Sequence, residues 1–112
     1  MLDTRGSSAL GAGQSVDLAV LGRAGVPAAG VGAVVLNVTA TDAAASGYLT
    51  TWPKGEARPT ASSLNYTGGQ TIANLVVAKV GADGSITLWN SNDSAAMSSV
   101  NVVVDIVGWL AA

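Results

Sequence analysis

The segment Val31–Thr41, VGAVVLNVTAT, has the side-chain alternation of a β-strand that is buried on one side. One face of such a strand would carry Val34, Leu36, Val38 and Ala40, and the other Val35, Asn37, Thr39 and Thr41. A repeat of two residues, with β-branched side chains at most positions, is typical of a pleated strand rather than of a helix. We therefore expect a central strand here, in a chain whose sheets pack on one another.

Further short segments repeat this pattern along the chain. They cover residues 15–21, 48–52, 63–66, 73–80, 85–90 and 99–109. The stretches between them are rich in glycine, proline and small polar residues, which is the composition of turns and loops. Six to eight short strands without a helical period predict an all-β fold, an antiparallel β-sandwich with Greek-key or jelly-roll-like connections. At 112 residues, we expect a single domain spanning residues 1–112.

Two finer expectations concern the second half of the chain. Residues 73–80 and 85–90 are separated by a short connection in which glycine supplies positive φ, so we expect them to form an antiparallel β-hairpin. In the last segment, alternation places Val100, Val102, Val104 and Ile106 inside, and Asn101, Val103, Asp105, Val107 and Trp109 outside.

Composition argues against several functional classes. The chain has no cysteine and no histidine, so thiol nucleophiles, disulfides and the usual general base and metal ligand are absent. Its five basic residues are scattered and its net charge is −2, which argues against nucleic acid as a partner. No Gly-x-Ser-x-Gly elbow and no obvious pair of catalytic acids is present. We therefore expect neither an enzyme nor a bound cofactor.

Metal binding and membrane insertion are also not expected. Asp42, Asp83 and Asp93 lie in expected loops, but none of these loops has the dense alternating carboxylates of a calcium site. The longest apolar stretch, residues 100–112, is short and is interrupted by two polar residues. The segment that starts at Met1 lacks the apolar core of a signal peptide, so we expect either a leader that has been removed and replaced by Met1 or a protein that does not leave a cell by that route.

Five aromatic residues are open to two interpretations. Tyr48, Trp52, Tyr66, Trp89 and Trp109 could together form a platform on which sugar rings stack. They are also the largest apolar side chains in a chain without phenylalanine, and burying such rings contributes much of a small core's stability. Use in the core or at a protein interface is the simpler interpretation.

Charged residues near the two ends of the chain predict a structural ion pair. If the first and last strands are neighbours, Arg5 can bridge to Asp105 or to Asp3 with both nitrogens of its fork. We expect this set to stabilise the fold rather than to act chemically.

Several segments carry a resemblance to a known module. They are LDTR (2–5), GVPAAGVGAVVLNVTAT (25–41), GYLTTWP (47–53), RPTASSLNYTGGQTIANLVV (58–77), VGADGSITLWN (80–90) and VVVDIVGW (102–109). In this order the chain resembles an all-β accessory module of about this length in secreted and surface proteins of actinobacteria. The resemblance implies a non-catalytic role in display or attachment, with no catalytic residue to carry over. Many similar modules have cysteines at the positions of Lys54 and Thr87, and a closing Gly-Tyr-Phe where this chain has Gly108-Trp109-Leu110.

Two functions follow as expectations. The first is a structural interaction module on an extracellular or particle surface, most concretely a capsid-decoration or tail protein of a phage virion, which oligomerises through Val103, Val107 and Trp109. The second is a carbohydrate-binding or adhesion module of a secreted actinobacterial protein, which would expose several tryptophans on one patch. The expected partners are neighbouring protein subunits, with a glycan as the alternative. The candidate interaction residues are Tyr48, Trp52, Trp89, Val103, Val107 and Trp109.

Overall fold

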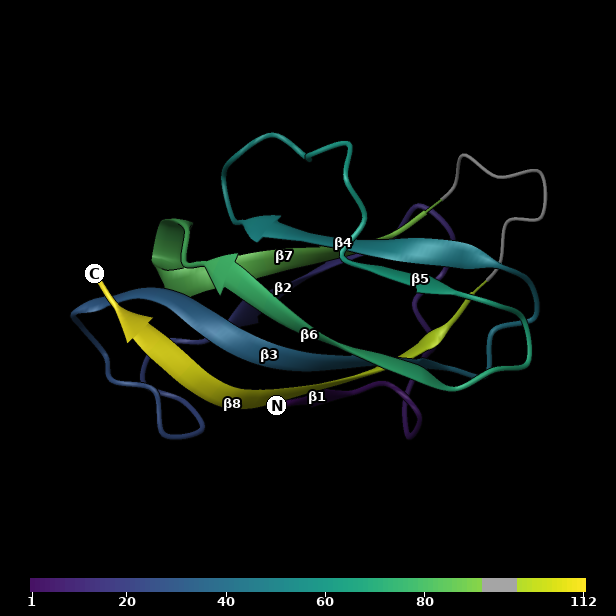
Figure 1. The fold of residues 1–112 in the computed structure, drawn as a ribbon, viewed down its shortest axis with the longest axis horizontal. Helices are drawn as coiled ribbons and strands as arrows, with labels where there is room; N and C mark the ends of the chain where they lie inside the picture. The colour runs from purple at the N-terminus through teal and green to yellow at the C-terminus, as the bar shows by residue number, and fades with distance from the viewer. Residues whose placement is uncertain (92–98) are drawn as a thin grey trace.

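The computed structural model describes residues 1–91 and 99–112 and shows a β-sandwich of two four-stranded sheets (Figure 1). The strands are β1 (Leu2–Asp3), β2 (Ser15–Ala19), β3 (Val31–Thr41), β4 (Gly47–Pro53), β5 (Leu64–Tyr66), β6 (Ile72–Lys79), β7 (Ser85–Asn90) and β8 (Asn101–Ala111). A single 3-10 turn, η1 (Ala82–Gly84), is the one helical element among the described residues. The all-β prediction is confirmed.

The strand order is that of a jelly roll. The first sheet runs β1-β8-β3-β6 and the second β2-β7-β4-β5, with every neighbouring pair antiparallel. The pairs β1·β8, β2·β7, β3·β6 and β4·β5 are those of one long hairpin that has rolled up into two layers. Most connections therefore cross from one sheet to the other.

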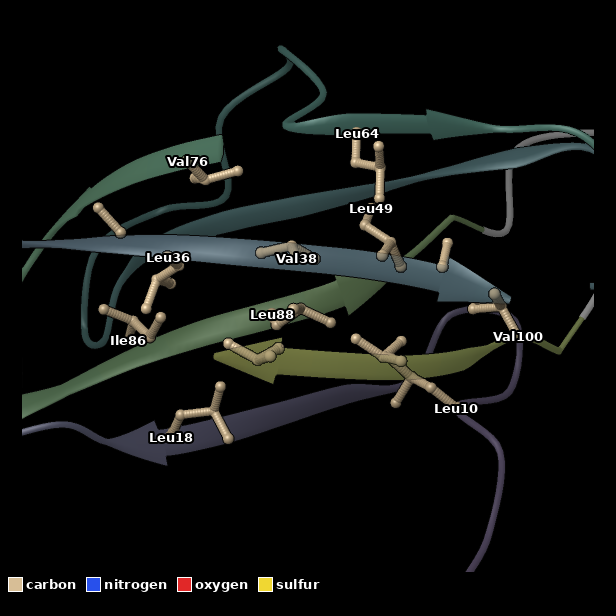
Figure 2. Packing of buried hydrophobic residues seen from close by; sticks show 14 of the residues in the cluster. Leu10, Leu18, Leu36, Val38, Leu49, Leu64, Val76, Ile86, Leu88 and Val100 are labelled. Atoms are coloured by element: carbon tan, nitrogen blue, oxygen red, sulfur yellow. The ribbon is translucent and has the colours of Figure 1, made fainter. Parts of the chain in front are cut away.

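The core lies between the two sheets. Val34, Leu36, Val38 and Ala40 of β3 are fully or almost fully buried, as their alternation predicts. They meet Leu49 of β4 and Ile86 and Leu88 of β7, and Figure 2 shows side chains from both sheets filling the space between the layers. Each such aliphatic side chain contributes about 1.5–3 kcal/mol relative to an exposed one, so the core is the main source of stability.

The expected hairpin between residues 73–80 and 85–90 is wrong. The strand β6 pairs with β3 in the first sheet, whereas β7 pairs with β2 and β4 in the second. The intervening turn does have positive φ at Asp83 (57°) and Gly84 (65°). Its backbone, however, docks on the end of β4, because the Ala82 amide donates to the Lys54 carbonyl at 2.9 Å. The turn thus connects strands of two different sheets rather than two paired strands of one sheet.

A β-bulge changes the faces of β8. Val35 pairs with Gly108 and Leu36 with Ile106, which leaves Val107 as the extra residue. Beyond the bulge Trp109 pairs with Val34, a residue of the inner face, because opposite residues share a face. Val107 and Trp109 are exposed, as expected, at 59% and 42%. The expectation that they form one outward row with Val103 is wrong, because the bulge resets the alternation between Val107 and Trp109.

Candidate interaction surfaces

The candidate interaction residues lie on two different sheets. Tyr48 and Trp52 belong to β4 and Trp89 to β7, all in the second sheet. Val103, Val107 and Trp109 belong to β8 in the first sheet. The surface expected from the sequence is therefore divided. Tyr48, Trp52 and Trp89 lie on the outer side of the second sheet, and Val103 and Val107 lie on the outer side of the first. Trp109 takes the register of the inner face near the end of β8, where it is 42% exposed.

Tyr48, Trp52 and Trp89 form what we call the aromatic face. Their strand neighbours Leu49 and Leu88 are fully buried in the core, so these three side chains point to the outer side of the second sheet. The rings of Tyr48 and Trp89 meet edge to face, with centroids 5.9 Å apart and planes at 62°. Of the five aromatic residues considered from the sequence, three share this face, whereas Tyr66 is buried in the core and Trp109 belongs to the first sheet.

The centre of the aromatic face is covered by a loop. The Arg58 guanidinium carbon lies 3.8 Å from the centre of the Trp89 ring, and Trp89 is only 5% exposed. Arg58 belongs to the loop of residues 54–63, which leaves β4 and stands out beyond it (Figure 1). A cation over an indole ring is worth about 0.5–2 kcal/mol. The half-buried rings of Tyr48 and Trp52 are what this face offers to a ligand.

A polar cluster borders the aromatic face. Lys54 Nζ lies 3.0 Å from Asp83 Oδ2 and 3.8 Å from Asp17 Oδ2, and Thr87 Oγ1 donates to Asp17 Oδ1 at 2.6 Å. The bond to Asp83 and its charge raise the pKa of Lys54. Lys54 and Thr87 thus converge on one carboxylate, that of Asp17.

The ion pair near the N-terminus joins Arg5 to Asp3. Arg5 Nε and Nη2 lie 3.0 and 2.7 Å from the two carboxylate oxygens, and the Arg5 backbone amide donates to Oδ1 at 3.0 Å. The side-chain bond from Arg5, followed by this amide bond, lowers the pKa of Asp3 to about 2. Asp105 lies 4.0 Å from the N-terminal amine instead. Both members of the pair are exposed, so its stabilising effect is small.

Tyr66 lies in the core rather than on the aromatic face. Its hydroxyl donates to Asn90 Oδ1 at 2.6 Å, and Asn90 Nδ2 donates to the Leu10 carbonyl at 3.1 Å. Both Tyr66 and Asn90 are buried. Burial raises the pKa of the Tyr66 hydroxyl, against the opposing effect of its hydrogen bonds with Ser91 and Asn90. One signal of this bond is visible in the sequence, because Asn90 is a polar residue at an inward position of β7.

The outer side of the first sheet carries exposed apolar side chains from three strands. Leu75 and Val77 of β6 are 62% and 60% exposed, and Val107 and Leu110 of β8 are 59% and 51% exposed. Val35 of β3, half buried, lies between Val77 and Gly108 in the sheet. We call these five residues the apolar face. Sequence reasoning missed Leu75 and Val77, although the unbroken apolar run LVVA already indicates a strand with apolar residues on both sides.

Other kinds of site are not found in residues 1–91 and 99–112. No three acidic side chains there lie close enough to hold a metal ion, and no cavity is detected. Asp93, one of the acidic loop residues considered above, lies outside the described residues. Within the described ranges no helix has the length and hydrophobicity needed to span a bilayer.

The comparisons with known proteins identify no relative. No protein-family model matches the chain, and no curated protein or solved structure matches it. The resemblance to the actinobacterial module therefore stays a prediction from the sequence.

Proposed function

We propose that this chain is a non-enzymatic interaction module, displayed on an extracellular or particle surface, that docks onto a neighbouring protein through its apolar face. The most concrete setting is the exterior of a phage virion, as a capsid-decoration or tail protein. The observation that carries the proposal is the apolar face itself, which places four well-exposed aliphatic side chains on one side of one sheet.

Such a face is unusual on a chain that works alone. Single exposed aliphatic residues are common on protein surfaces, but contiguous groups of them mark interaction sites. Here Leu75 and Val77 lie on β6, Val107 and Leu110 on β8, and Val35 between them on β3. Asp105 and Lys79 lie at the margins of this group, which gives it the polar rim of a protein interface.

A glycan-binding role of the aromatic face is the alternative. In its favour, Tyr48, Trp52 and Trp89 share one outer side of the second sheet. Against it, one of the two indole rings on this face, that of Trp89, is covered by Arg58 and only 5% exposed. Jelly rolls occur in both viral capsid proteins and lectins, so the fold does not decide between the two functions.

Co-sedimentation tests the proposal directly. The purified chain is mixed either with particles of an actinobacterial phage or with cell-wall glycan of the same host. We expect it to pellet with the particles, and the double variant Val107→Lys, Leu110→Lys to bind at least about tenfold more weakly, because charges would enter a desolvated contact. Trp52→Ala serves as the matched control and should bind as the wild type does.

Two outcomes would contradict the proposal. Failure to pellet with the particles, or pelleting that survives the double lysine variant, would remove the apolar face as the docking site. Pelleting with the glycan alone, abolished by Trp52→Ala and accompanied by a change in tryptophan fluorescence, would establish the alternative instead. Val107 and Leu110 are exposed and Trp52 is half-buried outside the core, so each variant should stay folded, and circular dichroism checks this.

A further inference from the structure

The four edge strands of the two sheets differ in how open they are to another strand. β1 has two residues, β5 three and β2 five, whereas β6 has eight. Part of β8 also extends beyond the short β1, but the bulge at Val107 interrupts it. Proteins protect exposed edges with short strands, bulges, proline or charge. The β6 edge has no proline and no bulge, and its one charge is Lys79 at the end.

The direction of the β6 backbone groups follows from its pairing with β3. Val80 N donates to the Gly32 carbonyl at 3.1 Å, one position beyond the pair Ala33 and Lys79. Hydrogen-bonded pairs alternate along an antiparallel ladder. The even-numbered residues of β6 therefore bond to β3, and the backbone groups of Ala73, Leu75, Val77 and Lys79 point away from it. No backbone hydrogen bond joins these four to any other element in the described part of the chain.

We propose that a second copy of this chain pairs with β6 in an antiparallel, two-fold symmetric arrangement, with Leu75 opposite the second copy's Val77. The β1-β8-β3-β6 sheets of the two copies then form one continuous sheet of twice the width. This pairing rests on the proposed function and deepens it, because it names the neighbour that β6 takes and joins two apolar faces into one.

Hydrogen bonding selects this register. With Leu75 opposite Val77 of the second copy, Ala73 lies opposite Lys79, and every outward-pointing backbone group of both strands finds a partner. Moving the strands by one pair, so that Leu75 faces its own equivalent, leaves Lys79 opposite Thr71, outside the strand. The full-length register therefore makes the most hydrogen bonds.

Side chains favour the same arrangement and a second copy as the occupant. Leu75 and Val77 are both well exposed. Each Leu75 would pack on the Val77 of the other copy across the new strand pair, where aliphatic pairs stabilise a sheet. The two Lys79 side chains would lie at opposite ends of the strand pair, whereas a parallel arrangement would bring them together. The β6 strand is thus complementary to its own reversed copy in hydrogen bonding, in apolar contact and in charge.

Measurement of molar mass with charge-swap variants tests the pairing and its register. Sedimentation equilibrium of the wild-type chain should show a dimer. The double variant Leu75→Lys, Val77→Lys places like charges opposite each other at both contacts, so we expect its dissociation constant to rise at least about a hundredfold. The double variant Leu75→Glu, Val77→Lys places opposite charges at the same contacts and should restore the dimer. Val107→Lys, on the same face but away from the edge, is the control and should leave the mass unchanged.

The outcomes separate this pairing from the proposed function. A wild-type monomer up to about 1 mM, or a dimer that the double lysine variant does not weaken, overturns the pairing and leaves particle binding through Val107 and Leu110 untouched. If the double variant Leu75→Glu, Val77→Lys does not restore the dimer, the proposed register is overturned. In the register where Leu75 faces its own equivalent, this variant would place the two new glutamates opposite each other. A wild-type chain that forms the dimer but does not pellet with the particles would instead contradict the proposed function. Circular dichroism of each variant checks that the sandwich is retained.

Discussion

The buried Tyr66 hydroxyl of β5 is hydrogen-bonded to side chains at the end of β7 and just beyond it, Asn90 and Ser91. It donates to Asn90 Oδ1 at 2.6 Å, and both groups lie where water does not reach. Tyr66→Phe would leave the Asn90 oxygen without this donor, and a buried polar atom that loses its partner costs about 1–3 kcal/mol. We expect the free energy of unfolding in urea to fall by that amount, and an unchanged value would contradict the role given to this bond.

Asp3 gives a dependence of stability on pH. Its pKa in the folded chain is lowered to about 2 from an ordinary 3.8, first of all by the side-chain bond from Arg5. A carboxyl with a lowered folded pKa stabilises the fold above its unfolded pKa, and this contribution is lost as the pH falls through the folded value. The wild type and Asp3→Asn should therefore differ in melting temperature at pH 6 and converge near pH 2. A difference that persists at pH 2 would show that Asp3 acts through something other than its charge.

Side chains near each other in sequence were predicted better than those brought together by the fold. The inward set of β3, from Val34 to Ala40, followed from alternation alone. The partner of Arg5 did not, because the sequence allowed both Asp3 and Asp105 and only the path of the chain after β1 selects between them. The cover of Trp89 by Arg58 was equally out of reach, since the two residues are joined only through a long loop and two strands.

The turn between β6 and β7 depends on Gly81, which is required for lack of space rather than for a positive φ. A Cβ at Gly81 would lie 2.3 Å from Lys54 N and 2.4 Å from Lys54 O, so the turn could no longer dock on the end of β4. Gly81→Ala should lower the free energy of unfolding by about 1–3 kcal/mol, as forced overpacking does. Gly6→Ala is the matched control, because nothing lies within 4 Å of its Cβ position and the melting temperature should barely change. Equal melting temperatures for the two variants would contradict this account of the turn.

Strand positions followed from the sequence, and strand partners only in part. Seven of the eight strands cover segments whose alternation or turn signals were visible, and the jelly-roll class was expected. The turn residues between β6 and β7 are compatible both with a hairpin and with the observed connection between the two sheets. A turn fixes the local direction of the chain but does not determine which sheet the next strand joins. The bulge at Val107 left no local signal other than Gly108, and it decided which side Trp109 takes.

The folded chain separates its two candidate surfaces onto opposite outer sides of the sandwich. The aromatic face is covered at its centre by Arg58, whereas Leu75, Val77, Val107 and Leu110 stay exposed on the other side. A substitution on one surface should therefore leave the other unaffected, since sites without shared contacts behave independently. In our proposals the apolar face is the docking surface and the open edge of β6 is the site of pairing with a second copy.

Hydroxyl-radical footprinting of the chain in its native assembly, compared with the dissociated chain, tests most directly which side is in contact. We expect oxidation of Leu75, Val77, Val107 and Leu110 to fall in the assembly while that of Tyr48 and Trp52 stays unchanged. Protection of Tyr48 and Trp52 with undiminished oxidation of the four aliphatic residues would contradict the assignment of the apolar face as the binding surface.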